Sequence, residues 1–180
     1  NAQLLQDNEH GTLKDDAVVE CVISAARGGL SADAILIDHT TTLPRLTTKR
    51  AERLRAEGMK YLHCPVFMGP PAARNAQGVM LATGPKALFE SVQAELARMT
   101  GRLQYMGERT DLAAVNKLLG NAMIIGVCAV MADVLTLARA CGVDAVDAVD
   151  LLGSLDMNAM VARRGTSMAS GDFSPNFELV

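Results

Sequence analysis

Short apolar runs alternate with amphipathic stretches along the first part of the chain. The apolar runs occupy residues 34–38, 60–66, 78–84 and 102–106. Runs of this length beside turn-forming residues are typical of strands buried on both faces. Helical spacing of apolar residues marks the intervening stretches 15–26, 44–57 and 85–99. Strands that alternate with helices predict an α/β fold with a parallel sheet.

Three parts of this region carry further detail. Residues 1–13 are polar and show no clear period, so no element is predicted there. The helix expected over 44–57 begins with Pro44 and places Ala51 and Leu54 on an apolar side. Arg50 falls on its opposite, polar side together with three other cations. The connection at 67–71 is expected to be a stiff loop, because it contains two prolines.

The pattern changes near Glu108, after which every predicted element is helical. Helices are expected over 111–141, 143–152 and 157–170. The first of these is apolar nearly all round, which predicts a buried helix that ends at Gly142 with a left-handed cap. Asn121 and Asp133 bracket an apolar run shorter than the roughly 18 residues of a membrane span, so no membrane partner is predicted.

Lys117 and Asn121 interrupt this apolar helix near its start. They are four residues apart, so both side chains project from one face. One interpretation is that the Lys117 stem is buried and its ammonium reaches water, with Asn121 as a satisfied core amide. The other is that the two side chains form the polar wall of a ligand pocket. The polar segments elsewhere in the sequence, described below, favour one of these two interpretations.

Composition narrows the class of protein. The 180 residues are 49% hydrophobic and 21% charged, as in a globular protein, and the net charge of −3 argues against nucleic-acid binding. The four cysteines match no metal or redox spacing, and each lies in an apolar segment. The three histidines form no ligand pair at helical spacing, so no metal site is predicted. Buried free thiols and the lack of a signal peptide favour a reducing, cytoplasmic location.

Polar residues gather where the predicted strands end. The segments are Asp38–Pro44, Cys64–Pro71 and the start of the long helix with Lys117 and Asn121. In parallel α/β sheets, ligands bind beyond the carboxyl ends of the strands, and small-molecule sites favour domain interfaces. The sequence therefore predicts a small-molecule site that all three segments contact.

These segments resemble the β-hydroxyacid dehydrogenase family, which includes 3-hydroxyisobutyrate dehydrogenase and is related to 6-phosphogluconate dehydrogenase. Asp38-His-Thr-Thr-Thr-Leu-Pro44 is similar to the family's Asp-x-Ser-Thr-x-x-Pro segment, and Cys64-Pro-Val-Phe-Met-Gly69 lies where the family has Ala-Pro-Val-Ser-Gly-Gly. Lys117-Leu-Leu-Gly-Asn121 matches its Lys-x-x-Asn-Asn element. Met80–Gly84 and Asp172–Phe177 resemble a strand end and a helix end of the family.

The resemblance implies a partial Rossmann-type parallel sheet followed by an all-α domain that a long helix enters. Residues 1–107 would be the C-terminal portion of a dinucleotide-binding domain, and residues 108–180 an incomplete helical domain for substrate binding and dimerisation. The cofactor would be NAD or NADP. The implied activity is hydride transfer between nicotinamide and a small hydroxy acid, aldehyde or ketone.

The resemblance also assigns roles to single residues. Lys117 would be the general acid/base, and a buried lysine has a pKa below roughly 10.4, closer to the range useful in catalysis. Cofactor contacts would come from Lys14, Asp15 and Thr40. The implied substrate-binding residues are Thr40, Phe67, Met68, Gly69 and Asn121.

Three departures from the family pattern change these expectations. Phe67 and Met68 replace the Ser-Gly that binds a substrate carboxylate, so a more apolar ketone, aldehyde or imine becomes plausible. Gly120 replaces the first asparagine of the pair beside Lys117. No G-x-G-x-x-G turn for the dinucleotide phosphates occurs in the sequence, which indicates a fragment that binds the cofactor weakly by itself.

Two functions from different classes follow from the sequence. The first is an NAD(P)-dependent dehydrogenase or reductase in which Lys117 moves the proton. The second is a catalytically inactive, dehydrogenase-like scaffold that dimerises through its helical part. The apolar helices lead us to expect a dimer or tetramer in either case.

Overall fold

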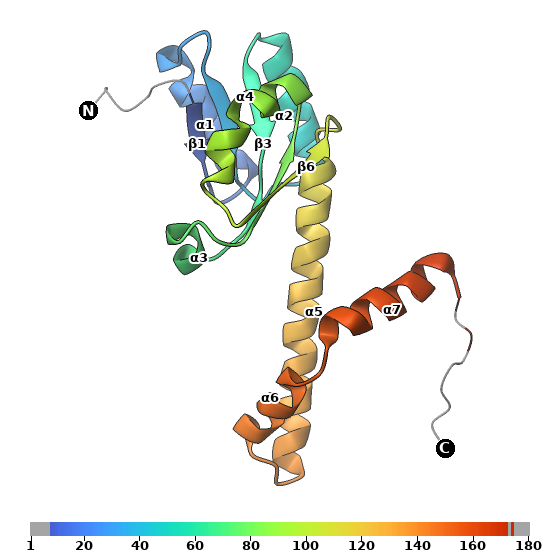
Figure 1. The fold of residues 1–180 in the computed structure, drawn as a ribbon. Coiled ribbons are helices and arrows are strands. Elements are labelled where there is room, and N and C mark those ends of the chain that lie inside the picture. The colour runs from blue at the N-terminus through green and yellow to red at the C-terminus, as the bar shows by residue number, and fades with distance from the viewer. Residues whose placement is uncertain (1–7, 173, 175–180) are drawn as a thin grey trace. The chain divides into compact units, whose positions relative to one another are not determined.

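A computed structural model describes residues 8–172 and residue 174, and it has an α/β part followed by helices (Figure 1). The strands are β1 (Asn8–Gly11), β2 (Ile35–Asp38), β3 (Lys60–His63), β4 (Val66–Phe67), β5 (Val79–Thr83) and β6 (Arg102–Gly107). The helices are α1 (Asp16–Ala26), α2 (Pro44–Ala56), α3 (Pro70–Arg74), α4 (Lys86–Ala97), α5 (Leu112–Ala140), α6 (Ala145–Gly153) and α7 (Met157–Ser170), with a short 3-10 turn, Arg27–Gly29. The described chain forms two compact units that divide within α5, after Ile124.

The six strands form one mixed, mostly parallel sheet in the order β1-β2-β3-β5, with β4 and β6 both pairing with β5. β1, β2 and β3 are parallel to one another, and β6 is parallel to β5. The predicted α/β class is thus confirmed. The sheet is not parallel throughout, however, because β5 runs antiparallel to β3 and to β4. Nothing in the hydrophobic pattern distinguished these directions.

Helices cover both faces of the sheet, and the alternation of side chains along each strand decides which core each residue joins. Leu36 and Tyr61 pack with Val19 and Ile23 of α1 and Leu54 of α2 on one face. The residues that alternate with Leu36 and Tyr61 along β2 and β3 face the other side of the sheet, where α4 covers them. That second cluster consists of Ile35, Ile37, Leu62, Cys64, Met80, Ala82, Phe89, Val92 and Leu96.

Local structure differs from expectation in three places. The polar N-terminal stretch contains β1, whose backbone pairs with β2 in register Asn8 to Ile35. This strand has no apolar run, so pattern alone could not find it. The run predicted as one strand over 60–66 is broken after His63, and the expected loop at 67–71 contains the end of β4 and the start of α3. The strand is interrupted at Pro65, since proline has no backbone N–H to donate to the strand ladder.

The long helix α5 forms where predicted, but only its first turns are buried. Ala113, Ala114 and Lys117 are its buried residues, whereas Ile125 is 67% and Leu137 is 65% exposed. The prediction of a helix buried along its length is therefore wrong. Composition shows that a residue is apolar, and it does not show whether the same chain supplies a surface to cover it. Gly142 has the predicted left-handed conformation, with φ +72°.

α5 also meets the length and hydropathy criteria for a membrane-spanning helix. Its most apolar 18-residue window has a mean hydropathy of 2.0, and none of that window is buried. The argument from Asn121 and Asp133 that the apolar run is too short therefore fails. Core helices of soluble proteins meet the same criteria, and a lack of membrane partners stays a prediction.

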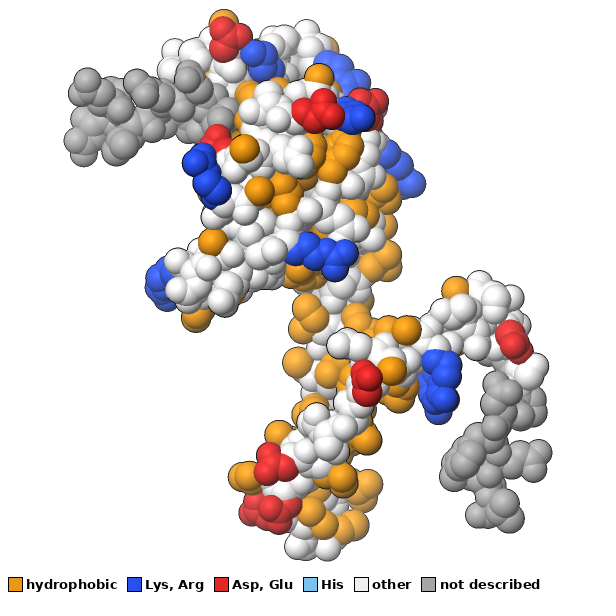
Figure 2. Space-filling model, in the orientation of Figure 1, with side chains coloured by type: hydrophobic (Ala, Val, Ile, Leu, Met, Phe, Trp, Pro, Cys, Tyr) orange, Lys and Arg blue, Asp and Glu red, His pale blue; other side chains and the backbone are white. Residues whose placement is uncertain are grey.

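The second unit contains the rest of α5 with α6 and α7. Asp144 and Asp156 cap α6 and α7 by accepting hydrogen bonds from Val146 N and Ala159 N. Apolar side chains are exposed on all three helices (Figure 2). They include Val130, Leu137, Val146, Val149, Leu151, Val161 and Met168. Of the family segment at Asp172–Phe177, only Asp172 and Ser174 lie within the described residues.

Cysteine burial also differs from expectation. All four thiols are free, as predicted, but only Cys64 is buried, while Cys21, Cys128 and Cys141 are exposed. Burial raises the pKa of the Cys64 thiol, which keeps it protonated and unreactive.

Candidate functional site

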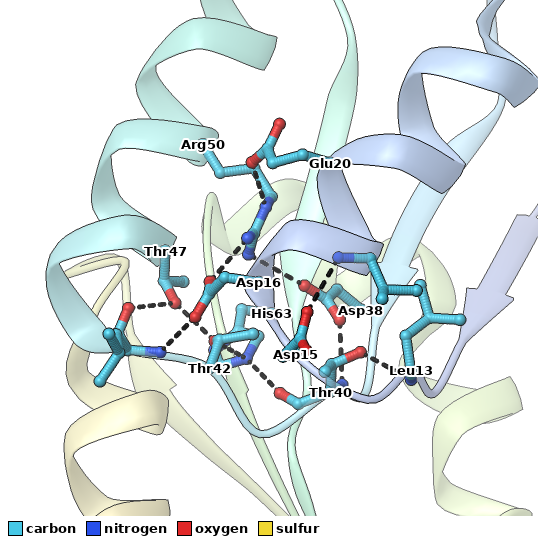
Figure 3. Close-up of polar contacts among 12 residues, drawn as sticks. Leu13, Asp15, Asp16, Glu20, Asp38, Thr40, Thr42, Thr47, Arg50 and His63 are labelled. Carbon is cyan, nitrogen blue, oxygen red and sulfur yellow. Dashed lines mark hydrogen bonds and ion pairs between the residues drawn. The ribbon is translucent and has the colours of Figure 1, made fainter.

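The loops that follow β1 and β2 are joined by a short series of hydrogen bonds (Figure 3). Asp38, the last residue of β2, accepts a hydrogen bond from Thr40 N at 2.9 Å, which shapes the turn after the strand. The Thr40 hydroxyl accepts from Leu13 N at 3.0 Å, so it ties this turn to the loop after β1. Since β1 and β2 are parallel, the two loops lie at the carboxyl edge of the sheet, where ligands of such folds bind.

A buried arginine holds the same region together from α2 (Figure 3). Arg50 is 1% exposed and donates to Asp16 Oδ1 at 2.7 Å, Glu20 Oε1 at 2.8 Å and Asp38 Oδ2 at 3.3 Å. Tyr61 Oη donates to the same Asp38 oxygen at 2.8 Å. One guanidinium thus joins α1, α2 and the end of β2. The expectation that Arg50 lies on a polar outer face is wrong, because α1 places carboxylates over it.

The partners of Arg50 keep its guanidinium charged. Burial by itself lowers the pKa of the Arg50 guanidinium, but its contacts with Tyr61, Asp16 and Asp38 outweigh burial, and the pKa is raised. The pKa of Tyr61 is well above its ordinary value, because burial and then the Asp38 carboxylate disfavour a phenolate. Tyr61 therefore stays a neutral donor to Asp38.

His63 belongs to the same turn, and sequence reasoning gave it no role. Its Nε2–H points at Thr40 O, 3.0 Å away, and at the Thr42 hydroxyl, 3.2 Å away. A carbonyl can only accept, so the proton is on Nε2 and Nδ1 carries the lone pair. Among the described residues nothing donates to this buried Nδ1. Burial is the main cause that lowers the pKa of His63, and the ring is neutral.

The other two histidines meet each other although they are far apart in sequence. His39 Nδ1–H donates to Cys64 O at 2.8 Å, and its Nε2 lies 2.9 Å from His10 Nδ1. Burial lowers the pKa of His39. A cavity of about 560 Å³ next to His39 is also lined by Thr12, Met68, Gly69, Arg74 and Arg98. Helical spacing could not reveal this pair, because β1 and β2 bring it together.

The predicted acid/base, Lys117, is buried near the start of α5. Lys117 as a whole residue is 8% exposed, and its Nζ lies 4.0 Å from the centre of the Phe67 ring. Burial lowers the pKa of Lys117. No described residue accepts a hydrogen bond from its ammonium. The Lys117 amine therefore lies against an aromatic ring, and its place in a ligand pocket stays a prediction.

The remaining predicted site residues are distributed as follows. Phe67 ends β4, and Met68 and Gly69 connect it to α3, while Asn121 lies half-buried on α5 one turn after Lys117. Lys14 and Asp15 are exposed, and Asp15 Oδ1 caps α1 by accepting from Val18 N. Thr40 is fully buried and acts within the protein. Within the described chain, no hydrogen bond or ring contact joins Lys117 to the Thr40 turn, so their joint action on a ligand stays a prediction.

Comparison with known proteins assigns this architecture. A family model described as the NAD binding domain of 6-phosphogluconate dehydrogenase matches residues 10–107, more than half of the chain. A 2-(hydroxymethyl)glutarate dehydrogenase from Eubacterium barkeri is 25% identical over 173 residues, which are 93% of this chain and 57% of that protein. The chain thus spans about half the length of this relative. The predicted resemblance to the hydroxyacid dehydrogenases is confirmed.

Two further similarities are relevant to function. The protein named cytokine-like nuclear factor N-PAC from Aedes aegypti is 26% identical over 178 residues, 95% of this chain and 31% of that protein. An imine reductase from Myxococcus stipitatus, solved in complex with NAD+, superposes with a TM-score of 0.79 at 20% identity. The match covers 92% of this chain and 58% of that structure, and at this identity it shows the shared fold.

Proposed function

Because the chain belongs to the family of the NAD-binding domain of 6-phosphogluconate dehydrogenase, we propose that the protein containing it is an NAD(P)-dependent dehydrogenase or reductase. Its substrate is a small hydroxy acid, aldehyde or ketone, and Lys117 is the general acid/base. The whole protein is the enzyme in this proposal. The 180 residues contain no G-x-G-x-x-G turn for the dinucleotide phosphates.

The buried amine of Lys117 is the observation that carries this proposal. Its pKa is lowered by burial, which moves the group toward the pH at which a general acid/base is efficient. In the reductive direction Lys117 Nζ donates a proton to the substrate oxygen, and in the oxidative direction it takes the hydroxyl proton. Asn121, on the same helix one turn later, is suited to orient that oxygen through its amide.

The residues at the sheet edge fit the nicotinamide end of a dinucleotide. Exposed polar side chains of Thr12, Lys14 and Asp15 follow β1, and the bond from Leu13 N to Thr40 fixes their loop beside the turn after β2. When bound, NAD(P) supplies or accepts the hydride at the substrate carbon. The protein's contribution there is to hold the two loops in one geometry and to keep His63 and His39 uncharged beside them.

The test is Lys117→Ala in the full-length protein, with Lys86→Ala as the matched control. Lys86 is an exposed lysine of α4 whose ammonium lies 3.7 Å from Glu90 Oε1. Loss of a general acid/base lowers turnover by about 10²- to 10⁴-fold, whereas cofactor binding measured by fluorescence or calorimetry stays nearly unchanged. Turnover of Lys117→Ala equal to that of Lys86→Ala would exclude the role.

Self-association is the second part of the proposal. The exposed apolar residues of α5, α6 and α7 are too numerous for a monomer's surface, and a second copy is the partner expected to cover them. We therefore propose a homodimer or a larger homo-oligomer in the cytoplasm, without membrane or nucleic-acid partners. Light scattering of the full-length protein tests this, and a monodisperse monomer without detergent would contradict it.

A second candidate function is supported by the match to a protein named as a nuclear factor. In that case the fold is a dimerisation scaffold without catalysis, since a fold does not imply a function. Phe67, in place of a polar residue of the family, favours it, and the buried Lys117 opposes it. Cofactor absorbance with a panel of aldehydes, ketones and imines separates the two: oxidation of NADH or NADPH by any of them excludes the scaffold.

A further inference from the structure

The contact between Lys117 and Phe67 has no counterpart in the family pattern. The Lys117 ammonium lies over the ring face, 4.0 Å from its centre, and the ring itself is half-buried at the end of β4. An aromatic face carries negative potential and attracts a cation, more strongly where water is excluded. Among the described residues, this ring is the group that compensates the buried charge of Lys117.

Gly120 explains how the ring reaches this position. A Cβ added at Gly120 would lie 2.4 Å from Phe67 Cζ and 2.7 Å from Cε1, so the ring rests directly on the backbone of α5. Residues 117 and 120 are three apart and share a helix face, so ring and ammonium lie on the same side of α5. Glycine is unfavourable inside a helix, and here the closeness of the ring accounts for it. Phe67 and Gly120 are thus one structural unit.

We propose that Phe67 is a positioning residue for Lys117 and a determinant of substrate class. Its ring fills the space that Gly120 leaves open, holds the Lys117 ammonium over its face, and selects neutral carbonyl or imine substrates over those with a carboxylate near the reacting carbon. This inference rests on the proposed acid/base role of Lys117.

Two physical effects produce the selection. The ring offers no hydrogen-bond donor and its face is negative, so a carboxylate placed there loses water without compensation. A carboxylate bound to Nζ would also stabilise the charged amine and oppose release of its proton to the substrate oxygen. A neutral carbonyl or imine suffers neither effect.

The first experiment measures the titration of Lys117 in the full-length protein, without any substrate. Competitive acetylation at a series of pH values, read by mass spectrometry, gives the pKa of that amine. Phe67→Leu keeps the apolar cover and removes the aromatic face, so the pKa falls further, by about half a pH unit or more. Phe67→Ser admits water, so the pKa rises toward the ordinary lysine value. Gly120→Ala displaces the ring and shifts the pKa in the direction of the serine variant.

Phe89→Leu is the matched control, because Phe89 is a buried ring that stacks on Tyr105 and does not contact Lys117. It leaves the Lys117 titration unchanged even where it lowers thermal stability. Shifts of the same sign in Phe67→Leu and Phe67→Ser, or no shift in either, would overturn the positioning role. Circular dichroism confirms that each variant is folded.

The second experiment compares butanal with succinic semialdehyde, which carries a terminal carboxylate. The wild type favours butanal in kcat/KM, and Phe67→Ser moves the ratio at least tenfold toward the carboxylate, mainly through KM. An unchanged ratio would overturn the selection. If Lys117→Ala retains full turnover, the proposed function fails, whereas the titration experiment still decides whether Phe67 positions the amine.

Discussion

Replacing Arg50 by methionine removes the guanidinium and keeps most of the apolar stem. Asp38, which is 6% exposed, then keeps the Tyr61 hydroxyl and Thr40 N–H but loses its countercharge. Asp16, whose side chain is 15% exposed, loses its 2.7 Å ion pair. Removing one partner of a buried ion pair costs about 3–5 kcal/mol, because a charge is left uncompensated.

The lower end of that range applies here. Asp38 retains two hydrogen-bond donors, and the Glu20 side chain is 44% exposed, so its share is at most about 1 kcal/mol. We expect Arg50→Met to lower the free energy of unfolding by about 3 kcal/mol. For a protein of this size each kcal/mol is worth about 2–4 °C, so Tm falls by roughly 6–12 °C.

Urea denaturation followed by far-UV circular dichroism measures this loss. Arg53→Met on the same helix is the control, since Arg53 is 40% exposed and pairs with Glu20 and Glu57 at the surface. Its loss costs less than about 1 kcal/mol. Adding Asp38→Asn to Arg50→Met removes the orphaned charge and recovers part of the stability. Equal costs for Arg50→Met and Arg53→Met would refute the reasoning.

Two other predictions follow from the buried groups. Stability falls as pH drops below about 6.5, because the unfolded chain binds protons there that buried His63, with its lowered pKa, does not. The variant His63→Gln reduces the slope of the free energy of unfolding against pH between about pH 5 and 6.5, and His39 contributes the rest of that slope. An unchanged slope in urea titrations at several pH values would count against burial of His63 as its cause. Gly84→Ala lowers stability by about 2 kcal/mol or more, because φ is +139° and the added Cβ would lie 2.7 Å from Leu62 Cδ2. Gly28→Ala, where a Cβ meets nothing within 4 Å, serves as its control in thermal unfolding and should be nearly neutral.

Much of the candidate site could be anticipated, but not how it is held together. A lysine and an asparagine four residues apart at the start of an apolar helix drew attention to Lys117, which is buried in the structure. The Phe67 ring over that amine could not be foreseen, since it depends on β4 pairing antiparallel to β5. His63 and Arg50 had no visible role because their partners come from other elements.

The sequence by itself determined the local elements and the α/β class. Apolar runs such as 35–38 and helical periods such as 44–56 express preferences that neighbouring residues set, and these elements formed where expected. Tertiary structure alone decided strand direction, the polar strand β1, the burial of Arg50 and the exposure of most of α5. These depend on which surfaces meet across long stretches of chain. A hydrophobic period records that a side chain avoids water, but the partner that excludes the water lies elsewhere in the fold.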